Sequence, residues 1–147
     1  MDSILAAIVL GHDELVDLLT TMLREMVAGR YAGVEIAFGA FSRWLKSHIR
    51  IEEEVVFPVA MGALDVGGAV VSALQKEHVC FQELCDEIAG QLQRSEWTTA
   101  IWNLRELEAA LKVHEQREEQ VLFPLVEARL RAPTLRELTA VVREKQV

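Results

Sequence analysis

The chain has 147 residues, of which 51% are hydrophobic and 26% are charged, and its formal net charge is -8 at pH 7. This length fits a single domain over residues 1–147 with a core of its own, and the ordinary charged fraction excludes wholesale disorder. The acidic balance excludes nucleic acid or an anionic membrane as the main partner, because phosphate binding needs a basic face. Cys80 and Cys85 diverge around one predicted helix, so we expect no disulfide between them.

The N-terminal stretch from Ile4 to Leu10 is apolar but short. It has no basic lead-in, and Gly11, His12, Asp13 and Glu14 follow it directly. These features fit neither a secretory signal nor a membrane span. We therefore expect a cytoplasmic protein with no membrane partner.

Apolar residues recur three and four positions apart in four long segments, residues 5–26, 38–59, 71–92 and 104–125. This spacing is typical of helices that bury one face. Gly or Pro residues separate or interrupt the segments at 29–33, 62–68, 90 and 133. Short connections between long helices predict an all-α fold, an antiparallel up-down-up-down four-helix bundle.

Two further features concern helix ends. Ser95 is a predicted N-cap, and the capping box of residues 134–137 predicts a short C-terminal fifth helix with Leu135, Leu138 and Val142 on one side. Pro58 and Pro124 lie inside helical patterns, where each removes a backbone hydrogen bond. We expect a bend or local break at both prolines.

The second half of the chain repeats the first at an offset of 66 residues. The matching positions are His12 and His78, His48 and His114, Glu52 and Glu118, and the dipeptides Phe57-Pro58 and Phe123-Pro124. All four histidines of the protein pair under this one shift. The repeat predicts two helical hairpins related by a pseudo-twofold axis.

Six polar residues occupy seam positions where Leu or Val is expected: His12, His48, Glu52, His78, His114 and Glu118. Each glutamate follows a histidine by four residues, so both side chains lie on one helix face. Burying an ionised carboxylate without a partner costs about 3 to 5 kcal/mol. A pair of metal ions would supply the missing positive charge, with imidazole nitrogens and carboxylate oxygens as ligands.

Other interpretations of these residues remain open from the sequence. A single histidine on an apolar stripe is commonly a satisfied core residue, and the whole set could be a buried polar network in a non-metal interaction bundle. Glu53, Glu54 and Glu119 fall off the seam and are interpreted as a solvated face. The tryptophans and Tyr31 are interpreted as packing residues.

With these motifs, the chain resembles the hemerythrin-like (HHE cation-binding) family over roughly residues 4–130. The residues that carry the resemblance are His12, the His48-to-Glu52 motif leading into Phe57-Pro58, the Glu77-His78 pair, and the His114-to-Glu118 motif leading into Phe123-Pro124. The resemblance implies a non-haem di-iron centre. His12 and His48 would hold one iron, His78 and His114 the other, and Glu52 and Glu118 would bridge them with an oxo or hydroxo ligand.

One departure separates the chain from the oxygen-carrying members of the family. They have a fifth histidine where this chain has Gln82, and an aspartate five residues after the last histidine, where this chain has Glu118 four residues after it. The chain is instead similar to the symmetric four-histidine, two-glutamate members, which include repair-of-iron-centres proteins. With so few protein ligands, each metal would keep an open position.

The resemblance implies a protein that binds iron and reacts with or senses small oxidants (dioxygen, peroxide or nitric oxide) in stress defence or iron-centre repair. The alternative is non-catalytic binding, storage or sensing of dioxygen or iron. The sequence leaves open whether the protein is an enzyme. It also leaves open which redox partner serves it and whether it forms a dimer.

Overall fold

The computed structural model describes residues 3–61, 64–129 and 142–144. Its elements are α1 (Ser3–Val27), α2 (Val34–Ile51), η1 (Glu52–Val56), α3 (Phe57–Met61), α4 (Leu64–Gln93), α5 (Trp97–Arg117), η2 (Glu118–Leu122) and α6 (Phe123–Arg129). The segments η1 and η2 are single π-helical stretches. The described residues contain helices and no strand, so the predicted all-α fold is confirmed.

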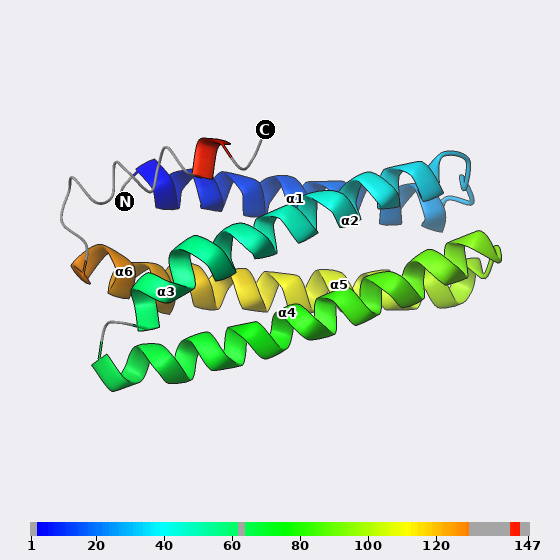
Figure 1. Cartoon of the computed structure of the whole chain (residues 1–147). Helices are drawn as coiled ribbons and strands as arrows, with labels where there is room; N and C mark the ends of the chain where they lie inside the picture. Colours follow the sequence, from blue (N-terminus) through cyan, green and yellow to red (C-terminus); the bar gives the residue numbers. More distant parts are fainter. Residues whose placement is uncertain (1–2, 62–63, 130–141, 145–147) are drawn as a thin grey trace.

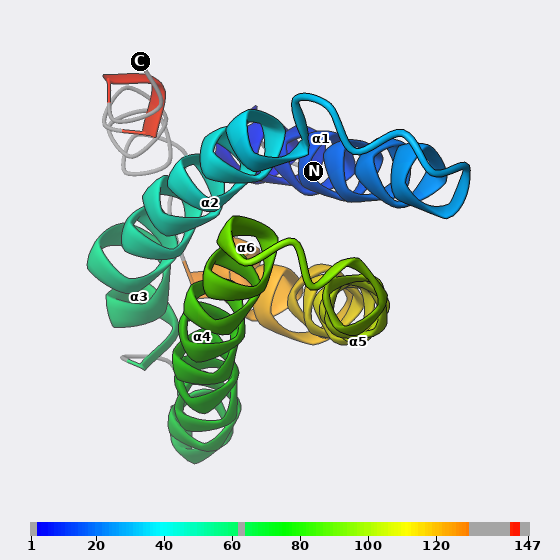
Figure 2. The same ribbon diagram turned by 90° about the vertical axis from the view of Figure 1, so that its right-hand side faces the viewer.

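The long helices run alternately up and down the molecule, which confirms the predicted antiparallel bundle (Figure 1). Helix α1 packs against α2 and α5, while α4 packs against α5 and α2. The segments α3 and α6 continue α2 and α5 and contact each other at one end of the bundle. The view along the bundle shows the four long helices surrounding a shared interior (Figure 2).

At the opposite end, two short turns close the hairpins. Gly29 and Gly33 adopt positive φ angles of 80° and 79°, a conformation that glycine tolerates because it has no Cβ. In the second turn the N-cap prediction for Ser95 is wrong: Ser95 has a φ of 56°, and α5 begins one residue after Glu96. Tyr31 and Trp97 stack with ring centroids 4.4 Å apart, joining the two turns as packing residues.

The predicted interruption at Gly90 is absent, because α4 continues through it. The interruption predicted at 62–68 is shorter than expected, because α3 ends at Met61 and α4 already begins at Leu64, so Gly68 lies within that helix. Most of the predicted fifth helix, residues 134–141, lies outside the described residues, but residues 142–144 are helical and Val142 is buried. None of the helices in the described part of the chain has an apolar stretch of the length that a membrane span requires.

The core consists of two apolar clusters on either side of a polar layer. On α1, Ile8 belongs to one cluster and Leu15 to the other, with the buried His12 between them. The same order repeats on α4, where Leu74 and Phe81 flank His78. The two clusters therefore seal the polar layer from both ends of the bundle.

The predicted local breaks at the prolines take the form of π-helical turns. The backbone N–H of Phe57 donates to the carbonyl of Glu52, five residues back, and Phe123 donates to Glu118 in the same way. Pro58 follows directly and has no N–H to continue the regular pattern. The break includes the two seam glutamates, whereas the sequence pattern placed it just beyond them.

Each π turn inserts one residue, so the buried face moves by one position beyond it. The regular seam predicts that Val121 and Leu125 face the core. In the structure Val121 is 41% exposed, and its neighbour Leu122 and also Val126 are buried instead. The π turn therefore lets the helix stay packed on the core beyond the seam glutamate, with a different set of apolar residues.

Candidate metal centre

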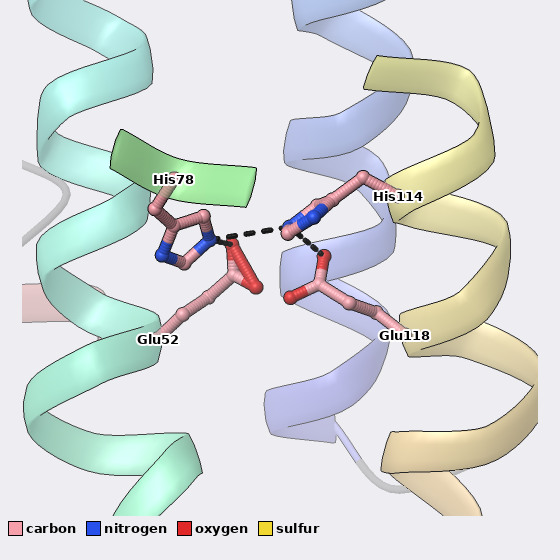
Figure 3. Close-up of side chains that lie close together, drawn as sticks. All are labelled: Glu52, His78, His114 and Glu118. Carbon is pink, nitrogen blue, oxygen red and sulfur yellow. Dashed lines mark hydrogen bonds and ion pairs between the residues drawn. The ribbon is translucent and has the colours of Figure 1, made fainter. Parts of the chain in front are cut away.

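All six predicted site residues lie in one buried layer of the bundle. They come from four helices: His12 from α1, His48 and Glu52 from the α2–η1 junction, His78 from α4, and His114 and Glu118 from the α5–η2 junction. Figure 3 shows four of them, with Glu52, His78, His114 and Glu118 pointing toward one another. The structure thus brings together all six predicted site residues.

One half of the layer, formed by α4 and α5, contains His78 and His114. Their Nε2 atoms lie 3.1 Å apart. The Oε1 atom of Glu118 lies 3.4 Å from Nε2 of His114, and the Oε1 atom of Glu52 lies 3.7 Å from Nε2 of His78. One ligand atom from each of these four buried residues falls within 4.8 Å of the others, a spacing at which one metal ion could be held.

The other half of the layer, formed by α1 and α2, contains His12 and His48, whose ring centroids lie 4.7 Å apart. Nε2 of His12 lies 3.1 Å from Oε1 of Glu118, and Nε2 of His48 lies 3.3 Å from Oε1 of Glu52. His12, His48 and Glu52 form a second compact group of potential ligand atoms. Each glutamate therefore contacts one histidine from each half.

Several of these buried polar atoms make no hydrogen bond within the described part of the chain. They are Nε2 of His12, Nε2 of His48, Oε2 of Glu52 and both carboxylate oxygens of Glu118. Because His12 and Glu118 come within 3.1 Å without the alignment of a hydrogen bond, their atoms converge on a shared space instead of pairing. Such orphaned buried atoms are costly unless a cation completes them, so the residues fit a metal site.

Two outer carboxylates hold the histidines of the α4–α5 half. Nδ1 of His78 lies 3.0 Å from Glu53, and Nδ1 of His114 lies 2.8 Å from Glu77, which also binds Arg117. When Nδ1–H donates to a carboxylate, the Nε2 lone pair is free to face the centre, an arrangement usual for metal-binding histidines. Glu53 is exposed, as its interpretation as part of a solvated face predicts, but its carboxylate also reaches His78 and so borders the site.

The α1–α2 half is supported less firmly. Nδ1 of His12 lies 3.9 Å from Glu119, which is beyond hydrogen-bond distance. At the position that the repeat pairs with Glu77, the chain has Gly11, where an added Cβ would lie 3.3 Å from the His48 ring. The described residues place no carboxylate at Nδ1 of His48. The two halves thus have matching histidines and glutamates facing the centre, but only the α4–α5 half has close carboxylates at the Nδ1 atoms of its histidines.

The phenylalanines of the two Phe-Pro motifs pack across the halves. Phe57 stacks on the His78 ring with centroids 5.3 Å apart, and Phe123 stacks on the His12 ring at 6.1 Å. Each ring is therefore fixed by an aromatic side chain from the other hairpin. This contact gives the repeated Phe a positioning role, beyond the break that the proline makes.

Burial sets the protonation of most of the histidines. It is the main reason that the pKa of His12 falls to about 3, and the nearby His48 lowers it further. Burial likewise lowers the pKa of His48 and of His114. These imidazoles are therefore neutral at pH 7, the form that binds metal ions.

For Glu52 and His78, the neighbouring charges outweigh burial, and the pKa of each moves in the direction that favours its charged form. Burial acts to raise the pKa of Glu52, but the surrounding histidines, His48 first, outweigh burial and lower it to about 2. Burial acts to lower the pKa of His78, and the carboxylates of Glu52 and Glu53 outweigh it and raise it. The Glu52 carboxylate is therefore ionised, as a metal ligand must be.

One further glutamate borders the layer. Glu115 is only 6% exposed, its Oε1 makes no hydrogen bond to the residues described, and it lines the same internal cavity as His12 and His48. Burial, followed by the charges of Glu52 and Glu119, raises its pKa to about 9. Glu115 was not predicted as a site residue, although the repeat pairs it with Ile49, which is buried, and so gave a signal for the burial of Glu115.

A four-helix bundle with a buried layer of histidines and glutamates defines a class of helical metal-binding domain. The family model of the hemerythrin HHE cation binding domain matches residues 3–126. The chain therefore belongs to the hemerythrin HHE cation-binding family, as the resemblance predicted. The comparison with curated proteins gave no significant match, and the comparison with solved structures gave none either.

Proposed function

We propose that the protein binds two iron ions in the buried layer. His12 and His48 would hold one ion, His78 and His114 the other, and Glu52 and Glu118 would bridge both. The observation that carries this proposal is the crossed set of contacts, in which each glutamate reaches one histidine of each half. The family assignment supports the choice of a metal.

A pair of iron ions would supply two-electron chemistry toward dioxygen, peroxide or nitric oxide. The residues around the buried layer would hold the ligands in position and keep the layer dry. Phe57 and Phe123 fix two of the imidazole rings, and the two apolar clusters exclude water from the layer. We therefore propose a role in reacting with or sensing such molecules, with stress defence or iron-centre repair as the biological setting.

A second candidate is reversible iron binding, as in a store or sensor, without turnover. The difference between the two halves favours this function, because the histidines of the α1–α2 half have no carboxylate as close to Nδ1 as those of the α4–α5 half. Such a half would release its ion first. A sensor of this kind loses helical structure when iron is removed, since the ions link the two hairpins.

Substitution tests the division of ligands. Glu52→Ala and Glu118→Ala should each lose metal from both positions, whereas His12→Ala should mainly empty one. Iron content per chain is measured after loading under anaerobic conditions, with Glu83→Ala, an exposed change on α4, as the control. Equal loss of a single ion in all three site variants would contradict the bridging roles.

Turnover separates the two candidate functions. The iron-loaded protein is mixed with hydrogen peroxide and, separately, with nitric oxide, and consumption is followed against the metal-free protein. Catalytic consumption of either supports the reactive role. Inertness to both, together with loss of circular dichroism on chelation, would leave iron binding or sensing as the function.

A further inference from the structure

A surface groove lies beside the buried layer, between α1 and α5. It encloses about 450 Å³ and is lined by the acidic side chains of Asp13, Asp17, Glu115 and Glu119 together with Lys112. Asp13 and Asp17 are exposed, so the mouth of the groove faces solvent. A concave surface lined mainly by one sign of charge raises the local concentration of ions of the opposite sign.

Glu115 belongs both to this groove and to the internal cavity of the site. It shares the groove with Asp13 and the internal cavity with His12 and His48. Its side chain is more than nine-tenths buried, and its Oε1 has no hydrogen-bond partner among the residues described. A carboxylate oxygen in this position has no evident structural role, because nothing that the structure describes satisfies it.

The charges around Glu115 favour a cation. Glu52 lies on its inner side and Asp13 and Glu119 on its outer side, while Lys112 supplies a positive charge at the surface. The order of carboxylates runs from the solvent through Glu115 to the seam. Carboxylate oxygens are ligands that a hydrated divalent ion such as Fe²⁺ can take in exchange for its bound water.

A second opening near the site does not offer such a path. It lies beside His48, is lined by Trp44, Ser47 and Ile51, and has a volume of about 10 Å³. That is roughly the space of one water molecule, and it has no carboxylate among its lining residues. A metal ion that exchanges its bound water needs oxygen ligands along its way, so the acidic groove is the better entrance.

We propose that Glu115 is a transit ligand for a divalent cation, passing Fe²⁺ between the acidic groove and the His12–His48 half of the buried layer. The proposal rests on the proposed function, since it needs a metal in that layer. It adds an entry and exit route and a residue that serves it. It also gives a use to the buried carboxylate that the six ligands leave unexplained.

A transit ligand speeds loading and release by the same factor and leaves the final affinity unchanged. Glu115→Gln keeps the size of the side chain but removes the carboxyl group, which can give up its proton and bind an arriving cation. We expect it to slow both anaerobic Fe²⁺ loading and release to a chelator by about tenfold or more, the lower end of electrostatic effects on association. The amount of iron bound at equilibrium should equal that of the unmodified protein.

Loading is followed by the quenching of tryptophan fluorescence, because Trp44 and His48 line the same small cavity. Glu106→Gln, an exposed change on the same helix, is the matched control and should load at the normal rate. Lys112→Gln removes the positive charge at the groove and should speed loading. Added salt should slow loading of the unmodified protein, because it screens the groove.

Three results would overturn the proposal. Loading of Glu115→Gln at the normal rate removes the route, and lost iron capacity with a normal loading rate makes Glu115 a permanent ligand instead. If Glu115→Gln fails to fold, the exposed Asp17→Asn variant decides, and normal loading by it counts against the groove. If the unmodified protein takes up no iron at all, it is the proposed function that fails.

Discussion

Substitutions of Glu77, the carboxylate at Nδ1 of His114, test how much this outer partner contributes to metal affinity. Glu77 contacts Nδ1 of His114 at 2.8 Å and is itself bound by Arg117. Removing such an outer partner typically lowers metal affinity by about 10- to 100-fold, or roughly 1.4 to 2.7 kcal/mol. Glu77→Gln keeps an oxygen that accepts the hydrogen bond but loses the charge, so we expect the metal affinity to fall by about tenfold. Glu77→Ala loses both the hydrogen-bond acceptor and the charge, so we expect its metal affinity to fall by about 100-fold.

The assay is an anaerobic titration with Fe²⁺ against a chromogenic chelator, which resolves tight and weak binding steps. The His78–His114 half has the closer outer carboxylates, so the tight step belongs to it. Both Glu77 variants should weaken that step and leave the weaker one unchanged, while Glu83→Ala on the exposed side of α4 changes neither. The reasoning is refuted if Glu77→Ala weakens both steps equally or weakens only the weaker step.

Three further predictions concern the outer residues and the metal. Gly11→Ala should weaken only the weaker step in the same titration, because its Cβ would lie 3.3 Å from the His48 ring and displace it; a change in the tight step would contradict this. The folded-state pKa of Glu115 is about 9, above its ordinary value of 4.5, so folding favours the protonated form. Its contribution to stability is complete below pH 4.5 and is lost as the pH rises toward 9. The melting temperature of the metal-free protein should therefore fall less between pH 5 and pH 8 in Glu115→Gln than in the unmodified chain, and equal falls would refute this. Chelation should lower the melting temperature by about 5 to 10 °C, the equivalent of roughly 2.7 kcal/mol for a metal at a hundred times its dissociation constant, and an unchanged melting temperature would contradict it.

Much of the fold could be predicted because one apolar stripe repeats in every helix. Seam residues such as Leu15 and Leu107 are fully buried, as the spacing of apolar positions requires. The positions of the turns were predicted less well. Gly90 is the instructive case: glycine is unfavourable within a helix, yet α4 continues through it because packing of the long helix outweighs the local preference.

The inner site residues could be predicted from the repeat, whereas the outer ones could not. A buried histidine in an apolar stripe is visible in the sequence, because it replaces an expected Leu or Val. Glu53 and Glu77 occupy positions that point away from their own helix's seam, and each reaches a histidine on a neighbouring helix. Which neighbour a side chain reaches depends on how the helices are turned, and the sequence pattern does not contain that information.

The π turns explain the remaining difference. A regular helical period predicts that Val121 and Leu125 are buried, but one inserted residue at Glu118–Leu122 moves the buried face to Leu122 and Val126. The sequence contained two signs of this change. One was the proline after each turn, and the other was the pair of apolar residues that precedes each Phe-Pro motif.

The proposed metal centre depends on a charge balance in the middle of the bundle, where two carboxylates and four imidazoles face one another. Elemental analysis of the protein purified after expression with iron supplied tests that balance most directly. We expect two iron ions per chain, falling toward none in the double variant Glu52→Ala, Glu118→Ala. A metal content near zero in the correctly folded unmodified protein, with the melting temperature indifferent to added iron, would contradict it.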